Sequence, residues 1–157
     1  PQQWRQHEMA ARQAALIHAS LRAVQQALAH NAMLHKSSLS AQELEAINLS
    51  VSEATGCDYC LAAHTLMAKK AGFSGEQIHA LRRGEYTEDA RLDALVKFAQ
   101  TLVTTTGTLP EADVAALRHA GFSDQQVIEI VSAVSAILFT NMVNRVNDTV
   151  VDFPKAD

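Results

Sequence analysis

Apolar side chains recur along most of this chain at the spacing of an α-helix, and the alternation typical of strands never persists. One such stretch runs from Trp4 to His30 and predicts a single long helix. A second helix is expected to begin at Ser40, because Ser40 and Glu43 have the spacing of a capping box, and to end at Gly56. Both the periodicity and the boundary residues therefore predict helices.

Five further helices follow from the same periodicity and from the capping residues around it. They are expected at residues 57–70, from 74, from 87, between 108 and 121, and from 123 to about 147. Lys69 and Lys70 suit the C-terminal end of the first of these five, and Gly72 is expected to adopt the left-handed conformation after it. The prediction is an all-α fold, a bundle of about six to eight helices in a single domain over residues 1–157.

Length and composition narrow the classes of function. A chain of 157 residues with 48% hydrophobic and 19% charged residues is typical of one globular domain. A net charge of −4 predicts no basic surface for nucleic acid, and no apolar run is expected to reach the roughly 20 residues that span a bilayer. Two closely spaced cysteines do not make a secreted disulfide framework. We therefore expect a cytoplasmic protein that binds neither nucleic acid nor a membrane.

The two cysteines, Cys57 and Cys60, stand three residues apart, and His64 follows four residues later. At about 100° per residue a helix places all three side chains on one face, and Cα atoms three residues apart suit a disulfide. A thiol near a helix N-terminus ionises readily, and an imidazole one turn further on can accept its proton. The helix start favours Cys57 as the nucleophile, whereas the spacing to His64 favours Cys60. The residues alone predict a redox-active dithiol with a nearby base and leave the nucleophile open.

Three other interpretations of this cluster compete with the redox dithiol. Two cysteines and a histidine supply three of the four ligands of a zinc site, but the sequence has no second CxxC and no HxxxH. Haem attachment requires a histidine directly after the second cysteine, where Leu61 stands. Inert buried thiols are the third alternative. We expect no bound metal and no bound cofactor.

The remaining polar residues do not suggest a second site. The other six histidines are scattered without ligand spacing, and most are expected at the surface: His7, His18, His30, His35, His79 and His119. An amide-rich group near the end of the last helix is expected to be a solvated helix end, with a packing or subunit contact as the alternative. This group comprises Asn141, Asn144, Arg145 and Asn147.

Residues 40–73 resemble the carboxymuconolactone decarboxylase and alkylhydroperoxidase D (AhpD) superfamily. Its redox-active branch carries a glutamate, eleven residues, CxxC, three residues and a histidine, and this chain has Glu45, Cys57, Cys60 and His64 at that spacing. Shorter segments are also similar to the family, at residues 47–52, 71–74, 140–145 and 149–154. The resemblance implies an AhpD-like helical bundle.

The resemblance also implies a thiol-dependent peroxidase that reduces hydroperoxides. Cys60 matches the position that attacks the peroxide and becomes a sulfenic acid, and Cys57 matches the thiol that condenses with it to a disulfide. His64 and Glu45 match a proton relay that activates Cys60. An external dithiol, in some relatives a lipoyl group, then reduces the disulfide. The family assembles as trimers or hexamers, so a homo-oligomer is expected.

Two positions fit the family pattern less simply. Glu45 lies off the main apolar arc of its helix, so the helical wheel alone places it in solvent and makes Glu53, four residues before Cys57, the rival carboxylate. Tyr59 stands between the cysteines, where some relatives have a second histidine. Two alternative functions stay open: a general dithiol–disulfide oxidoreductase or redox sensor, and a non-catalytic helical oligomer.

Overall fold

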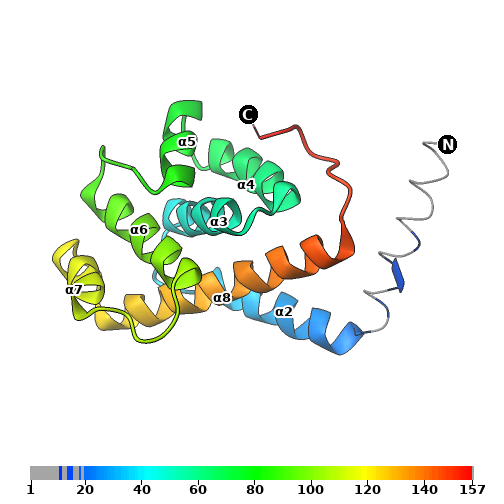
Figure 1. Ribbon diagram of the computed structural model, residues 1–157, viewed down its shortest axis with the longest axis horizontal. Coiled ribbons are helices and arrows are strands. Elements are labelled where there is room, and N and C mark those ends of the chain that lie inside the picture. Colours follow the sequence, from blue (N-terminus) through cyan, green and yellow to red (C-terminus); the bar gives the residue numbers. More distant parts are fainter. Residues whose placement is uncertain (1–10, 12–13, 16–17, 19, 157) are drawn as a thin grey trace.

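The computed structural model describes residues 11, 14–15, 18 and 20–156, and it has seven helices and no strand among them (Figure 1). The helices are α2 (Leu21–Leu34), α3 (Ala41–Thr55), α4 (Asp58–Lys70), α5 (Gly75–Arg83), α6 (Ala90–Thr104), α7 (Glu111–His119) and α8 (Asp124–Asn147). The predicted all-α bundle is confirmed.

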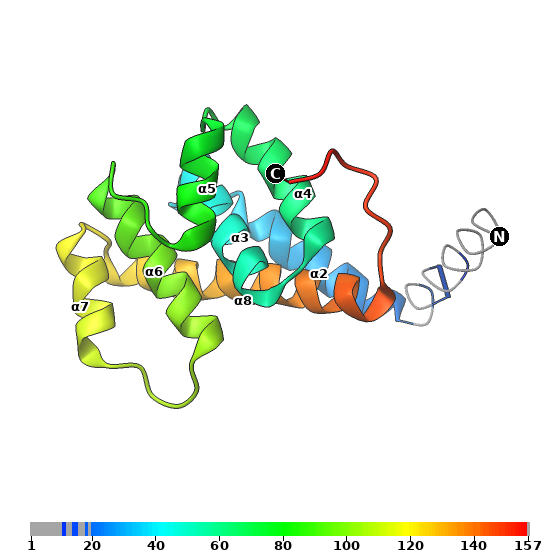
Figure 2. The same ribbon diagram turned by 45° about the horizontal axis from the view of Figure 1, so that its top comes forward.

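Helix α3 lies at the centre of the bundle (Figures 1 and 2). It packs against α4, α5, α6 and α8, and its residues Ile47, Leu49 and Val51 are fully buried. The long helix α8 runs past α3 with α2 beside it, and α7 packs on α6 and α8. Since neighbouring helices approach α3 from several sides, a side chain outside its main apolar arc can still be enclosed.

Serine caps define the starts of three helices. Ser40, Ser74 and Ser123 each accept the N–H of the third helical residue, whose side chain accepts the serine N–H in return. These bonds satisfy N–H groups that have no partner inside the helix, and they confirm the predicted starts. At the end of α3, Gly56 adopts φ 66°, the left-handed conformation that glycine reaches without a Cβ clash. The chain turns there, and Cys57 becomes the N-cap of α4.

The prediction of one helix from Trp4 to His30 is wrong at Ser20 and at its C-terminal end. Residues 1–10, 12–13, 16–17 and 19, which carry much of that expected helix, lie outside the described residues. Ser20 is non-helical, with φ −140° and ψ 54°, and α2 starts after it and continues to Leu34. Serine suits a helix end because its hydroxyl competes with the backbone for hydrogen bonds.

Two other helices begin later than the pattern predicted. Helix α6, expected from Thr87, starts at Ala90, because the Asp89 carboxylate accepts the N–H groups of Arg91 and Leu92. Helix α7 begins at Glu111, directly after Pro110. Aspartate is among the favoured capping residues, so the Asp89 cap decides where α6 starts.

Helix α8 meets the length and composition of a membrane span, although no apolar run of that kind is expected from the sequence. Its 24 residues include an 18-residue window of mean hydropathy 1.6, of which 28% is buried. Core helices of globular proteins meet the same criterion, so length and composition alone do not assign α8 to a membrane. One face of α8 is buried in the bundle through Ile130, Ala133, Val134, Ile137 and Asn141.

Candidate active site

The two cysteines form the first turn of α4. Their sulfur atoms lie within disulfide-bonding distance, and their Cα atoms are 5.3 Å apart, close to the usual separation in disulfides. The Cys60 N–H donates to the Cys57 Sγ at 3.3 Å, so the sulfur of the N-cap residue occupies the acceptor position that a capping oxygen usually fills. The two cysteines are therefore paired as a disulfide at a helix N-terminus.

Both cysteines are 2% exposed, and helix α8 covers one of the two sulfurs. The Asn144 side-chain amide donates to the Cys60 Sγ at 3.5 Å and to the Thr140 carbonyl at 3.1 Å. The expectation of a solvated helix end is thus wrong for Asn144, and the packing alternative is confirmed. Sequence spacing gives no direct signal for this contact, because 84 residues separate Asn144 from Cys60.

Asn141 ties α8 to the last turn of α3, just before the cysteines. It is fully buried, accepts from the Ser52 hydroxyl at 3.3 Å and donates to the Thr55 hydroxyl at 2.8 Å. The solvated-end expectation is wrong here too. A signal was available, because Asn141 continues the buried stripe of Ile130, Val134 and Ile137 at helical spacing.

The Glu45 carboxylate contacts the His64 imidazole. The Oε2 atom of Glu45 lies 2.9 Å from Nδ1 of His64, and the Asn48 amide donates to Oε1 at 3.3 Å. The side chains of His64 and Glu45 are 22% and 16% exposed, so the wheel-based placement of Glu45 in solvent is wrong. Helix α4 packs against α3 and brings His64 to this carboxylate. The rival Glu53 pairs instead with Arg82 at 2.6 Å.

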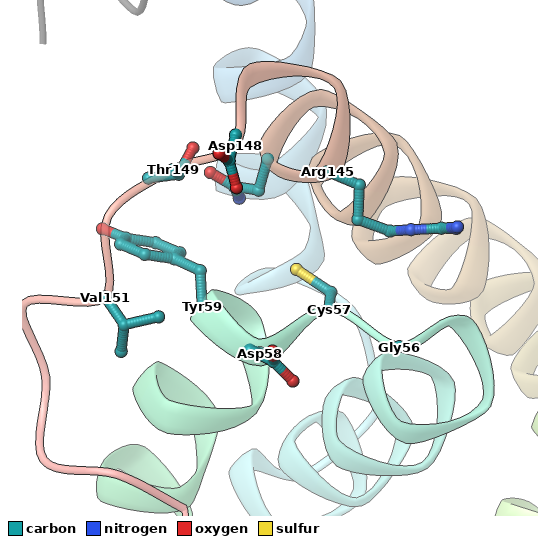
Figure 3. Close-up of a pocket in the computed structure, with 9 residues that line it drawn as sticks. Gly56, Cys57, Asp58, Tyr59, Arg145, Asp148, Thr149 and Val151 are labelled. Atoms are coloured by element: carbon teal, nitrogen blue, oxygen red, sulfur yellow. The ribbon is translucent and has the colours of Figure 1, made fainter. Parts of the chain in front are cut away.

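A pocket of about 320 Å³ opens beside Cys57 (Figure 3). Its walls come from the start of α4, the end of α8 and the C-terminal segment, through Gly56, Cys57, Asp58, Tyr59, Asn144, Arg145, Asp148, Thr149 and Val151. The Cys57 sulfur points toward the end of α8, between Tyr59 and Arg145 (Figure 3). Cys57 is a lining residue, whereas Cys60 is not among the described residues that line the pocket.

Tyr59 joins the site to the C-terminal segment. Its ring meets Phe153 edge to face, with ring centroids 5.4 Å apart. Burial raises the pKa of Tyr59 above its ordinary value, and the Asp152 carboxylate adds to this rise. The phenol is consequently protonated at neutral pH and can donate a hydrogen bond but cannot act as a base there.

The zinc interpretation of the cluster requires further ligands. Within the part of the chain that the structure describes, no group of three or more histidine, cysteine, aspartate or glutamate residues is placed to hold a metal ion. Cys57 and Cys60 bond to each other, and His64 turns its Nδ1 toward a carboxylate. The arrangement offers a dithiol and an acid–base pair.

Comparison with known proteins gives a family match in sequence and several matches in fold. The sequence profile of the carboxymuconolactone decarboxylase family matches residues 19–101, a range that includes Glu45, Cys57, Cys60 and His64. No curated protein sequence matches the chain.

Three solved structures illustrate the match in fold. A protein of unknown function from Agrobacterium tumefaciens, with a suggested AhpD role in antioxidant defence, is 22% identical at a TM-score of 0.80, over 88% of this chain and 97% of that one. An uncharacterized peroxidase-related protein from Silicibacter sp. TM1040 is 27% identical at a TM-score of 0.70. This match covers 78% of this chain and 68% of that one. A debrominase in complex with 2,3,4-tribromopyrrole is 18% identical at a TM-score of 0.69. This match covers 79% of this chain and 67% of that one.

Proposed function

The chain belongs to the carboxymuconolactone decarboxylase family, and from this membership and the site geometry we propose that it is a thiol-dependent peroxidase. One observation carries the proposal: a closed Cys57–Cys60 pair lies in the first turn of α4, and His64 of the same helix is paired with Glu45. A nucleophile, a second thiol and an oriented base are the groups that peroxide reduction by a dithiol requires.

The first half of the proposed reaction consumes the peroxide. The Cys60 thiolate attacks one peroxide oxygen, the O–O bond breaks, and the leaving alkoxide takes a proton to become an alcohol. Cys60 is thereby oxidised to a sulfenic acid. The Cys57 thiol then attacks the Cys60 sulfur, water leaves, and the disulfide forms.

His64 and Glu45 are proposed to move the proton in this sequence. The Glu45 carboxylate, 2.9 Å from Nδ1, favours the tautomer with its proton on Nδ1 and leaves the Nε2 lone pair free to act as a base. His64 stands four residues after Cys60, one helical turn away, so Nε2 serves the Cys60 thiol directly or through a water molecule. The imidazolium then returns the proton to the alkoxide. This relay is why the proposal assigns the nucleophile to Cys60.

A dithiol reductant completes the cycle, and the protein itself binds no cofactor in this proposal. A lipoyl group is one candidate reductant, and a reducing compartment such as the cytoplasm would supply it. We also propose assembly into a trimer or hexamer. Large apolar side chains on α2 and α8 that are mostly exposed in the single chain support this: Leu28 is 64%, Ile128 69% and Val146 78% exposed. Light scattering of the purified protein measures the subunit number.

The test of the proposed activity is consumption of an organic hydroperoxide with dithiothreitol or dihydrolipoamide as the reductant. Wild type is expected to turn over, and Cys60→Ser is expected to lose turnover because no sulfenic acid can form. A Glu53→Gln variant serves as the control, since that carboxylate lies outside the relay. Undiminished turnover in Cys60→Ser would overturn Cys60 as the nucleophile.

A general dithiol–disulfide oxidoreductase is the second candidate function. It is favoured by the pocket that Cys57 lines and by Tyr59, whose protonated phenol adds no base between the cysteines. Fast exchange with small disulfides together with slow peroxide turnover would select this alternative. Thiols that react neither with small disulfides nor with peroxide would instead indicate a non-catalytic assembly module.

A further inference from the structure

We propose that the pocket beside Cys57 receives a thiolate of the reductant, which attacks the Cys57 sulfur, and that Cys60 leaves as a thiolate stabilised by Asn144. This rests on the dithiol chemistry of the proposed function and adds three assignments to it: the sulfur that is attacked, the face from which the reductant arrives, and a residue that positions the leaving group.

Access distinguishes the two sulfurs, which are otherwise equally buried. Both cysteines are 2% exposed, but Cys57 lines the pocket and the Cys60 sulfur is in contact with the Asn144 amide of α8. Thiol–disulfide exchange requires the attacking thiolate to approach one sulfur and expel the other. The pocket therefore selects Cys57 as the sulfur that forms the mixed disulfide.

The charges around the pocket are mixed and include one cation. Arg145 lines the pocket, and Asp58 and Asp148 line it as well. Tyr59 and Thr149 add hydroxyl groups to the wall. These side chains suit a small polar thiol better than a large apolar one.

Asn144 accounts for the direction of the bond cleavage. Exchange is faster when the leaving thiol has a lower pKa, and a hydrogen bond to a thiolate lowers that pKa. The Asn144 amide already lies 3.5 Å from the Cys60 Sγ, so the charge that develops there on cleavage meets a donor that needs no rearrangement.

The backbone donor at Cys57 serves the second step. The Cys60 N–H lies 3.3 Å from the Cys57 Sγ at the positive end of α4, and it stabilises Cys57 when that sulfur leaves in turn. Each sulfur thus has its own hydrogen-bond donor for the step in which it carries charge.

The complete exchange transfers two electrons from the reductant to the protein. In the first step a bond forms between the reductant sulfur and Cys57, and the Cys57–Cys60 bond breaks with its electron pair on Cys60. In the second step the other thiolate of the reductant attacks its own half of the mixed disulfide and expels Cys57. The reductant leaves as a cyclic disulfide, and the two protons from its thiols balance the two new protein thiolates.

The direct test maps the mixed disulfide on the wild-type protein. Oxidised protein is treated with glutathione, a monothiol that cannot complete the second step intramolecularly, quenched early with acid and alkylated with N-ethylmaleimide. Tandem mass spectrometry of the peptide that carries both cysteines is expected to show glutathione on Cys57 and the alkyl group on Cys60 in at least about tenfold excess over the reverse. Glutathione mainly on Cys60, or equally on both, would overturn the proposal.

This readout uses no peroxide, so it separates the inference from the peroxidase proposal. Mapping to Cys57 without peroxide turnover would retain the exchange route and reject the peroxidase. Glutathione on Cys60 together with peroxide turnover would reject the exchange route and retain the peroxidase.

A variant tests Asn144 separately. In Asn144→Ala the disulfide is expected to open about tenfold more slowly with glutathione, the usual effect of losing one hydrogen bond to a charged group. The matched control is Gln125→Ala, which removes an exposed amide at the other end of α8 and should leave the rate unchanged.

A pH profile distinguishes this role of Asn144 from a merely structural one. In a Cys57→Ser background, the pH midpoint of Cys60 alkylation is expected to rise by about one unit when Asn144 is replaced by Ala. An unchanged midpoint together with an unchanged exchange rate would remove Asn144 from the proposal, and the wild-type map would still decide which sulfur is attacked.

Discussion

Replacement of Asn141 by Ala is expected to destabilise the fold through the loss of two buried hydrogen bonds. Asn141 is fully buried and bonds to the Ser52 and Thr55 hydroxyls at 3.3 and 2.8 Å. Ser52 is itself fully buried and its hydroxyl loses the Asn141 oxygen as acceptor, whereas Thr55 still donates to the Val51 carbonyl at 2.8 Å.

The magnitude follows from these partners. Two net hydrogen bonds at about 1 kcal/mol each, with one hydroxyl left unsatisfied, lower the free energy of unfolding by about 2–3 kcal/mol. For a chain of 157 residues this lowers the Tm by roughly 5–10 °C.

Chemical denaturation of wild type, Asn141→Ala, Ser52→Ala and the double variant checks this account. The two single changes share one hydrogen bond, so the double-mutant cycle should give a coupling free energy of about 1 kcal/mol. Gln125→Ala, at the exposed start of α8, should stay within about 0.5 kcal/mol of wild type. A loss below about 0.5 kcal/mol in Asn141→Ala, or strict additivity with Ser52→Ala, would refute the reasoning.

Three further predictions concern the relay, the tyrosine and the turn before the cysteines. Glu45→Gln removes the charge beside His64 and should lower kcat/KM for hydroperoxide by roughly ten- to a hundredfold, whereas Glu53→Gln should not; equal effects would contradict the relay. Burial raises the pKa of Tyr59, so its protonated form stabilises the fold below about pH 10, and this stabilisation is lost as the pH rises through the raised pKa. In chemical denaturation at increasing alkaline pH, the free energy of unfolding should therefore fall less in Tyr59→Phe than in wild type. Gly56→Ala should cost about 1 kcal/mol in thermal unfolding from its φ of 66° alone, since an added Cβ meets no atom within 4 Å; a neutral effect would show that the turn relaxes.

Local signals in the sequence predicted most of the helix boundaries. The capping boxes at Ser40, Ser74 and Ser123 are read from residues three positions apart, and the structure has both bonds of each. The pairing of the cysteines was equally local, because Cys57 and Cys60 share one helical turn and need no other element to meet.

Contacts between distant segments were beyond that local reasoning. A helical wheel identifies the side of α3 that faces the largest apolar surface, but α4 packs on another side and encloses Glu45. Only the family spacing promoted Glu45 over Glu53, and the structure brings Glu45 and His64 together.

The amide group of α8 shows the same limit and one missed opportunity. Asn144 meets Cys60 only because α8 crosses the start of α4, and spacing along the chain does not encode that crossing. Asn141, by contrast, stands in register with the buried apolar stripe, so its burial and its need for partners could have been predicted.

The most direct test of the central claim is the redox state of the Cys57–Cys60 pair after one equivalent of hydroperoxide is added to the reduced protein. The account predicts that two thiols disappear per peroxide, that mass spectrometry finds the Cys57–Cys60 disulfide, and that Cys57→Ser instead accumulates a sulfenic acid on Cys60. Thiols that remain reduced while the peroxide persists would contradict it.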